Sequence, residues 1–209
     1  MTIYRRSDWG AAPPKSPLNY NIGPGDSLVV HHTGGGAAPA SVPDAMAMLR
    51  GIQSSHQNGE YSDIAYNMAC DQFGNIYECR GMNAQGAATY SANEHTRAVV
   101  WLGNSDVEAP TQQALAAIAS LFASEVGRNL TSDATITGHR DWTATGCPGE
   151  TLYGMLPTIR SYTKPIPSEE TDEMMRSLRT ATGTIILADR LSYTVMPGSW
   201  PEVELALRQ

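Results

Sequence analysis

The sequence predicts an α/β domain, in which a central mixed β-sheet is flanked by helices, followed by a short C-terminal extension. Short apolar runs typical of buried strands alternate with segments of helical periodicity, and this alternation predicts helices packed on the faces of a sheet. The 209 residues suffice for one well-packed domain of about 150 residues plus an extension. Apolar residues make up 41% and charged residues 17%, so most of the chain is expected to fold.

The first part of the chain is predicted to form a strand, a helix and a hairpin. Residues 26–33 (DSLVVHHT) are a short apolar run that ends at glycines, which predicts a buried strand. Residues 41–57 have helical spacing, with Ser41 as the N-cap. In residues 63–81, two apolar-rich runs flank the turn-like segment DQFGN, which predicts a β-hairpin. The apolar side of the helix is expected to be Val42, Met46 and Leu49.

The second part is predicted to contain two strands and two helices. Residues 97–104 and 133–138 read as buried strands, and residues 110–127 as a helix between them. A further helix is expected after Pro148, although Pro157 disfavours its continuation. The core stripe of the first of these helices is expected to be Leu115, Ile118, Phe122 and Val126.

The C-terminal part is expected to be separate from this domain. We predict a domain over residues 1–162, a linker over 163–173 (TKPIPSEETDE) and a small element over 174–209 that contains two strand-like runs, GTIILA and LSYTVM. About 40 residues cannot bury much core alone, so this element docks on the main domain, self-associates or serves as an attachment module.

Charge and hydropathy exclude several classes of partner. The formal net charge of -7 argues against a nucleic-acid partner. No apolar run approaches the roughly 20 residues of a membrane helix, so membrane insertion is not expected. The N-terminus has no apolar run of the secretory-signal kind, so we expect synthesis in the cytoplasm and release by other means.

The three cysteines cannot all pair within the chain. Cys70 and Cys79 flank the predicted turn and could lie on facing strands. The alternatives are a disulfide and two packed thiols, of which we favour the reduced pair.

Two histidines and the third cysteine suggest a metal site. His139 and Cys147 lie in one polar segment after a predicted strand, and His31 and His32 lie at the end of another. Neighbouring side chains in a strand point to opposite faces, so only one of these two histidines can face a given site. Histidine and cysteine are preferred ligands of zinc. The alternative is a set of strand-end histidines satisfied by hydrogen bonds, and we favour zinc.

Four motifs in order resemble the type 2 N-acetylmuramoyl-L-alanine amidases, a family that includes peptidoglycan recognition proteins and many phage endolysins. These motifs are RRSDWGA, VVHHTGG, DIAYNMACDQFGNIYECRG and GHRDWTATGCPG, and the resemblance covers about residues 4–160. It implies a zinc hydrolase that cuts the amide between N-acetylmuramic acid and L-alanine of peptidoglycan. The implied zinc ligands are His31, His139 and Cys147; Tyr66 assists catalysis and Thr145 lines the reaction centre.

One departure from the family pattern concerns substrate binding. Ala88 stands where family members often carry a histidine, and His95 lies nearby in the sequence. His95 either compensates in part or is an exposed loop residue, and we favour the second. His56 closes the helix over 41–57 and is interpreted as a partner of the helix dipole.

Several other side chains near the motifs have open or structural roles. Trp9 is expected to pack at the N-terminal segment and Trp101 in the core. Trp142 lies in the segment with His139 and Cys147, and whether it lines the cleft of the predicted site stays open. Asp141 either orients a metal ligand or, as we favour, ties down its loop.

The favoured function is a phage endolysin that lyses the host cell wall. The alternatives are a non-catalytic peptidoglycan-binding protein, a cytosolic amidase that recycles muropeptides and a virion-associated enzyme. Binding-only members typically lack the cysteine ligand, and Cys147 is present here.

Overall fold

The computed structural model describes residues 1–163, 185–189 and 192–196. The chain divides into two units, Met1–Thr163 and Lys164–Gln209. Among the described residues, no helix is long and apolar enough to cross a membrane.

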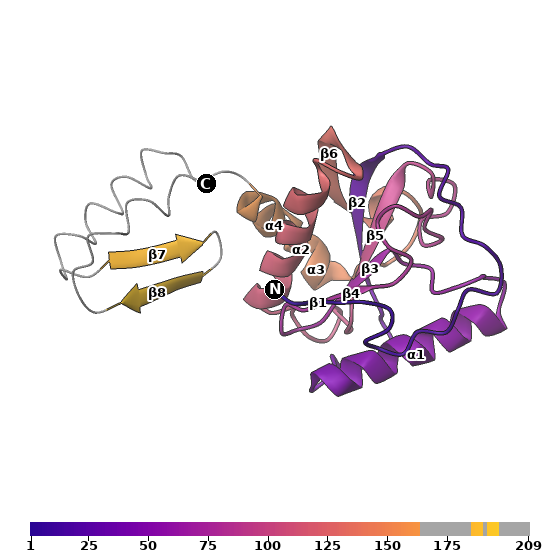
Figure 1. The fold of residues 1–209 in the computed structure, drawn as a ribbon, viewed down its shortest axis with the longest axis horizontal. Helices are drawn as coiled ribbons and strands as arrows, with labels where there is room; N and C mark the ends of the chain where they lie inside the picture. Colours follow the sequence, from indigo (N-terminus) through magenta and orange to yellow (C-terminus); the bar gives the residue numbers. More distant parts are fainter. Residues whose placement is uncertain (164–184, 190–191, 197–209) are drawn as a thin grey trace. The chain divides into compact units, whose positions relative to one another are not determined.

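The first unit is built on a six-stranded mixed sheet (Figure 1). In the strand order β1-β4-β3-β5-β2-β6, only the β3–β4 pair is antiparallel. The predicted mixed sheet is confirmed. The strands are β1 (Ile3–Tyr4), β2 (Gly25–His32), β3 (Met68–Cys70), β4 (Ile76–Glu78), β5 (Thr96–Trp101) and β6 (Leu130–Gly138).

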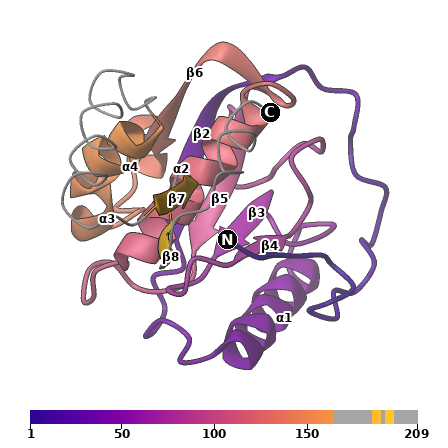
Figure 2. The ribbon, with the colours of Figure 1, turned by 60° about the vertical axis from the view of Figure 1, so that its left-hand side comes forward.

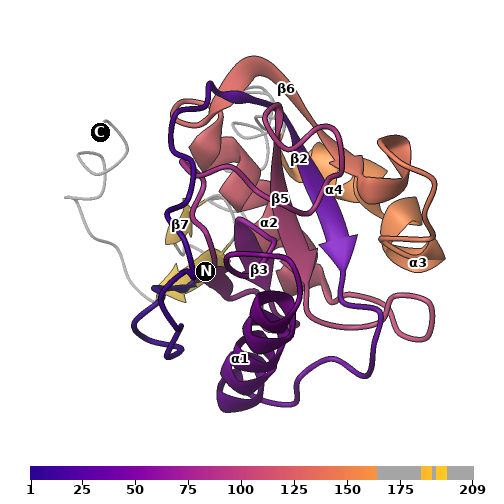
Figure 3. The same cartoon turned by 90° about the vertical axis from the view of Figure 1, so that its right-hand side faces the viewer.

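Helices cover both faces of this sheet. Figure 2 and Figure 3 show α1 on one face and α2, α3 and α4 on the other. Each face has its own apolar core, one beneath α1 and one beneath the other three helices. The helices are α1 (Val42–Asn58), α2 (Gln112–Glu125), α3 (Glu150–Gly154) and α4 (Leu156–Tyr162).

The strand alternation decides where the two histidines of β2 point. Leu28 and Val30 pack in the core beneath α2. Because successive side chains point to opposite faces, His31 lies on the α1 side of the sheet, and His32 on the other.

The predicted helices form, with differences in detail. Ser41 caps α1 by accepting from the Asp44 backbone N–H, as predicted. Leu49 is buried, whereas Val42 and Met46 are only partly buried, because Ala45 and Gln53 occupy the centre of the buried face. The predicted core stripe of α2 is confirmed at Leu115, Ile118 and Phe122, which are buried, whereas Val126 at the C-cap is partly buried.

Proline shapes the segment after the GHRDWTATGCPG motif, whose loop, residues 139–147, is called the metal loop below because it carries two of the predicted ligands. The helix expected after Pro148 is divided at Met155 into α3 and α4. Pro157 lies in the first turn of α4, where its missing N–H costs no helical hydrogen bond. Strand β6 begins at Leu130, three residues before the predicted start at 133.

One difference and one confirmed prediction concern the first and last strands. The sequence did not indicate β1, which is only two residues long and pairs with β4 at the edge of the sheet. The two strand-like runs near the C-terminus do form an antiparallel pair, β7 (Ile185–Asp189) with β8 (Ser192–Met196). Apart from Thr163 and these strands, the predicted linker and C-terminal element lie outside the described residues.

Cys70 and Cys79 are buried free thiols, as favoured from the sequence. Cys70 packs in the core beneath α2, and Cys79 in the core beneath α1. The two side chains therefore lie on opposite faces of the sheet, where no disulfide can join them.

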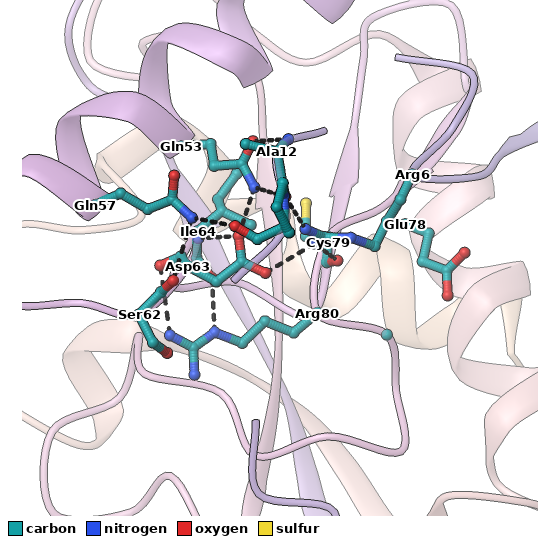
Figure 4. A network of polar contacts seen from close by, with 12 residues as sticks. Arg6, Ala12, Gln53, Gln57, Ser62, Asp63, Ile64, Glu78, Cys79 and Arg80 are labelled. Atoms are coloured by element: carbon teal, nitrogen blue, oxygen red, sulfur yellow. Dashed lines mark hydrogen bonds and ion pairs between the residues drawn. The ribbon is translucent and has the colours of Figure 1, made fainter. Parts of the chain in front are cut away.

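A buried polar network joins the N-terminal segment to α1 and to the segment before β3 (Figure 4). Asp63 is fully buried; it pairs with Arg6 at 2.9 Å and accepts from Gln53 at 2.6 Å. Gln53 also exchanges two hydrogen bonds, each of 2.9 Å, with the backbone of Ala12. Arg80 Nε donates to the Ile64 carbonyl at 2.7 Å. Asp63 Oδ2 makes no hydrogen bond within the described residues, and its partner is the ion pair with Arg6. Together these contacts fix the chain just ahead of Tyr66.

We expect Asp63→Asn to lower the free energy of unfolding by about 2 kcal/mol, because it leaves Arg6 without its buried counter-charge. Chemical denaturation monitored by circular dichroism measures the change. The matched control is Glu78→Gln, which removes a surface pair with Arg5 at 3.5 Å and should cost less than about 0.5 kcal/mol. Equal effects of the two substitutions would contradict a structural role for the buried network.

Candidate metal centre

His31 projects from the C-terminal end of β2 on the α1 side of the sheet and is only 1% exposed. Its neighbour His32 takes a different role, since its Nδ1 accepts from the Ser105 backbone N–H at 3.2 Å. His31 belongs to the candidate ligand set and His32 does not, although His32 also lines the cleft described below.

The neighbouring strand β6 brings His139 beside His31. In the parallel β2–β6 pair, Val30 is opposite Gly138, so the residues that follow them leave the sheet side by side. The two imidazole centroids lie 4.4 Å apart. Cys147 returns on the loop after His139, and its Sγ lies 3.6 Å from His31 Nδ1. The ligand atoms of all three side chains lie within 4.8 Å of one another.

The donor set and its spacing fit a tetrahedral zinc ion. Zn–S and Zn–N bonds of about 2.3 and 2.1 Å at a tetrahedral angle separate sulfur from nitrogen by about 3.6 Å. The Cys147–His31 separation has this value. His31 Nε2 is buried and has no hydrogen-bond partner among the described residues, and its Nδ1 contacts only the thiol. Three such ligands leave the fourth position open, as in catalytic zinc sites.

Burial sets the protonation of the three side chains. It lowers the pKa of His31, with a further contribution from His139, and it also lowers the pKa of His139. The neutral imidazole, which is the metal-binding form, is therefore favoured at both positions. Burial raises the pKa of Cys147 to about 11, against the opposing effects of the His32 backbone amide and Arg140. A bound cation would reverse that shift by stabilising the thiolate.

The three side chains open into a cleft of about 340 Å³. Its walls come from the end of β2, the end of α1, the segments around Tyr66 and Ala88, and the loop after β6. Both residues predicted to act beside the metal, Tyr66 and Thr145, line this cleft.

Tyr66 lies against His31, one of the three candidate metal ligands. Its ring centroid is 5.4 Å from that of His31, and the side chain is half-buried. Its hydroxyl makes no hydrogen bond to another described residue, which leaves it free for a ligand in the cleft. Burial, followed by the nearby Cys147, raises the pKa of Tyr66, so the hydroxyl keeps its proton at neutral pH.

Thr145 is exposed at the rim of the cleft, on the loop that carries Cys147. Its Oγ1 accepts from the Cys147 backbone N–H at 3.2 Å. Since this bond uses the oxygen as an acceptor, the hydroxyl proton remains available to a ligand.

His56 has a role that the sequence did not reveal. It lies in the last turn of α1, as its interpretation as a helix-dipole partner requires, and it also lines the cleft. Its Nδ1 accepts from the Ala65 backbone N–H at 3.0 Å. Its ring packs near those of Tyr61 and Tyr66, with centroids 5.3 and 6.0 Å away. No local pattern indicated this, because it depends on residues 59–65 turning back along the end of α1.

The structure shows whether His95 and Trp142 lie at the cleft. Ala88 lines the cleft, whereas His95 lies outside it on an exposed loop, with its Nδ1 3.9 Å from Asp26. Trp142 does not line the cleft, and its Nε1 donates to Thr137 Oγ1 at 2.8 Å. Trp9 and Trp101 are fully buried, as expected.

Asp141 ties down the metal loop, as favoured from the sequence. One carboxylate oxygen accepts from the Gly138 backbone N–H at 2.8 Å, and the other accepts from the Tyr153 hydroxyl at 2.6 Å. The carboxylate therefore joins the end of β6 to α3.

Comparisons with known proteins agree on one family. The sequence profile described as N-acetylmuramoyl-L-alanine amidase matches residues 22–150. Peptidoglycan-recognition protein LB of Drosophila melanogaster is 34% identical over 163 residues, which are 77% of this chain and 70% of that protein. The human N-acetylmuramoyl-L-alanine amidase is 32% identical over 181 residues, which are 83% of this chain and 31% of that protein.

Solved structures give the same result for the fold. Wild-type Drosophila peptidoglycan-recognition protein LB has a TM-score of 0.71 at 33% identity, covering 75% of this chain and 92% of that one. A tyrosine-to-phenylalanine variant of that protein in complex with tracheal cytotoxin has a TM-score of 0.71 at 32% identity, covering 75% and 93%.

We expect His56 to remain neutral at pH 6.5 with its proton on Nε2. Burial, followed by Arg80, lowers the pKa of His56, and Nδ1 is occupied as an acceptor. As the pH falls below about 6.5, the unfolded chain binds this proton before the folded one does, so stability is lost. Nitrogen-15 NMR titration reports both the tautomer and the midpoint, with His56→Gln assigning the signal. A midpoint above 6.5 would overturn this expectation.

Proposed function

This chain belongs to the N-acetylmuramoyl-L-alanine amidase family, and we propose that it is a zinc-dependent amidase of peptidoglycan. The substrate bond is the amide between the lactyl group of N-acetylmuramic acid and L-alanine of the stem peptide. The observation that carries this proposal is the convergence of His31, His139 and Cys147 in one open cleft. A structure of a relative in complex with tracheal cytotoxin supports the choice of a peptidoglycan fragment as ligand.

The three side chains would hold the metal, and neighbouring groups would act on the substrate. A zinc ion there would lower the pKa of a bound water toward about 7 and polarise the scissile carbonyl. Tyr66 keeps its proton and donates it in a hydrogen bond to the oxygen of the reacting amide as negative charge develops. Thr145 supplies a second hydroxyl donor from the loop after β6, anchored through its bond to the Cys147 amide.

The second candidate function is peptidoglycan binding without catalysis. It is supported by several relatives that are named as peptidoglycan-recognition proteins. Peptidoglycan-recognition protein SD of Drosophila melanogaster, for example, is 32% identical over 159 residues, covering 75% of this chain and 84% of that protein. The complete His-His-Cys set and the free Tyr66 hydroxyl favour the enzyme here.

We further propose that the substrate is the intact wall, that the enzyme is an endolysin, and that the chain is divided by function. Residues 1–162 form the amidase domain, residues 163–173 link it to the rest, and residues 174–209 serve wall targeting or docking. The boundary between the two units after Thr163 supports this division. Intact sacculi compared with soluble muropeptides as substrates separate a wall-lytic enzyme from a recycling amidase.

We expect the protein to release new L-alanine amino groups from purified peptidoglycan without new reducing sugar ends, because it cuts the amide and leaves the glycan intact. Labelling of free amines and a reducing-sugar assay measure the two products. Cys147→Ser and a chelator-treated sample should both lose the activity, and added zinc should restore only the chelated sample. If the protein sediments with the wall but exposes no new ends, the binding-protein candidate replaces the amidase.

Tyr66→Phe should lower kcat by about 100-fold or more, because it removes a donor to the developing charge and leaves the ring in place. The Kd for zinc should stay within about twofold of the wild-type value, since Tyr66 is not a ligand. Steady-state kinetics and a zinc competition titration measure the two effects. Tyr20→Phe, which removes an exposed hydroxyl outside the cleft, is the control. Unchanged kcat in Tyr66→Phe would remove the tyrosine from the mechanism.

A further inference from the structure

Arg140 follows the ligand His139 directly, and its side chain reaches across the metal loop. Its Nη2 donates to the Gly146 carbonyl, and its backbone N–H donates to the Cys147 carbonyl at 3.0 Å. These two carbonyls belong to the peptide groups on either side of the Cys147 α-carbon. Because peptide groups are planar, fixing both of them fixes the direction of the Cα–Cβ bond of Cys147, from which the thiol projects.

Polar contacts, not core packing, hold the cysteine segment in place. Besides the Arg140 bonds, the Cys147 N–H donates to Thr145 Oγ1 at 3.2 Å and the Gly149 N–H donates to the Gly146 carbonyl at 2.8 Å. Ala144, Thr145 and Gly146 are exposed, and they contribute no side chain to either core. Yet Cys147 Sγ must stay 3.6 Å from His31 Nδ1 to complete the donor set. A small rotation of the cysteine would open this distance and cost the metal a ligand.

Arg140 is itself held from two sides by α3. Its guanidinium carbon lies 4.6 Å from the centroid of the Tyr153 ring, and Nη1 pairs with Glu150 at 2.6 Å. The Tyr153 hydroxyl donates to Asp141, which fixes the ring beneath the guanidinium. The side chain of Arg140 is only 19% exposed, although that of Glu150 is 83% exposed. The arginine is therefore oriented by contacts with other protein side chains.

We infer that Arg140 is a positioning residue that sets Cys147 at metal-binding distance from His31, so that zinc affinity depends on its guanidinium fork. This inference rests on the metal site of the proposed function. It assigns Arg140 no contact with substrate or metal. The planar fork matters because one nitrogen binds Glu150 while the other binds the Gly146 carbonyl, which a lysine cannot reproduce.

The test compares zinc affinity in the full chain and in three variants. Arg140→Met keeps the apolar stem, Arg140→Lys keeps the charge, and Arg128→Met removes an exposed arginine on α2's C-terminal side that pairs with Glu125. The backbone bond to Cys147 remains in every variant, so only the side chain is tested. Competition with a chromophoric chelator gives the Kd for zinc, and the thiolate-to-cobalt absorption of the Co²⁺ form reports ligation by Cys147. Thermal unfolding of the metal-free proteins reports folding.

We expect Arg140→Met to raise the Kd for zinc by about 10- to 100-fold and to weaken the thiolate–cobalt band, with Arg140→Lys raising it by about tenfold. Arg128→Met should stay within about twofold of wild type. If folded Arg140→Met has a Kd for zinc within twofold of the wild-type value, the inference is overturned. Wild-type zinc affinity in Arg140→Lys would also overturn it, because only the charge of Arg140 would then matter. If Arg140→Met does not fold, the lysine variant decides.

The same titration separates this inference from the proposed function. Wild-type protein that binds one zinc but releases no L-alanine ends would remove the amidase and leave the positioning role intact. Wild-type protein that binds no zinc would overturn both.

Discussion

The parallel pairing of β2 with β6 is the constraint on which the site depends. Parallel neighbours end at the same edge of a sheet, so residues that follow them in sequence emerge together. Val30 opposite Gly138 therefore brings two histidines from distant parts of the chain to one point, with their rings 4.4 Å apart. The other side chains of the cleft lie next to this pair. The loop after β6 places the Cys147 thiol beside His31, and the segment before β3 places Tyr66 beside it.

The strands and long helices could be predicted because their patterns are local. The alternation in β2 predicted that its two histidines project from opposite faces of the sheet, and the caps and apolar spacing located α1 and α2. The candidate metal ligands could be proposed from the sequence because their motifs occur in a fixed order and resemble a family, and the structure brings their ligand atoms within 4.8 Å of one another. In contrast, β1 could not be predicted, since two residues carry no periodic signal and their pairing with β4 depends on residues more than 70 positions away. The role of His56 was missed for a similar reason, because the backbone amide that it binds lies in a segment of no regular structure.

Burial performs two opposed tasks in this cleft. It keeps both histidines neutral and therefore ready to bind a cation, and it also keeps the thiol protonated in the absence of one. Metal binding at such a site is accompanied by loss of a proton, so its apparent strength increases with pH. The same desolvation holds the proton on Tyr66, which suits a hydrogen-bond donor and would not suit a general base.

The central position of β2 has a consequence for how the chain reaches its native state. Ser27 in β2 bonds to Thr135, which lies 108 residues further along the chain, and Thr33, just after β2, bonds to Gly103, which is 70 residues away. Both edges of β2 therefore stay unpaired during synthesis until the second half of the domain has left the ribosome. Contacts of such long range slow folding, and an apolar strand with two open edges is a site for aggregation in the meantime. The pairing that brings His31 and His139 together thus makes folding of the first unit dependent on β6, which is synthesised more than 90 residues after β2.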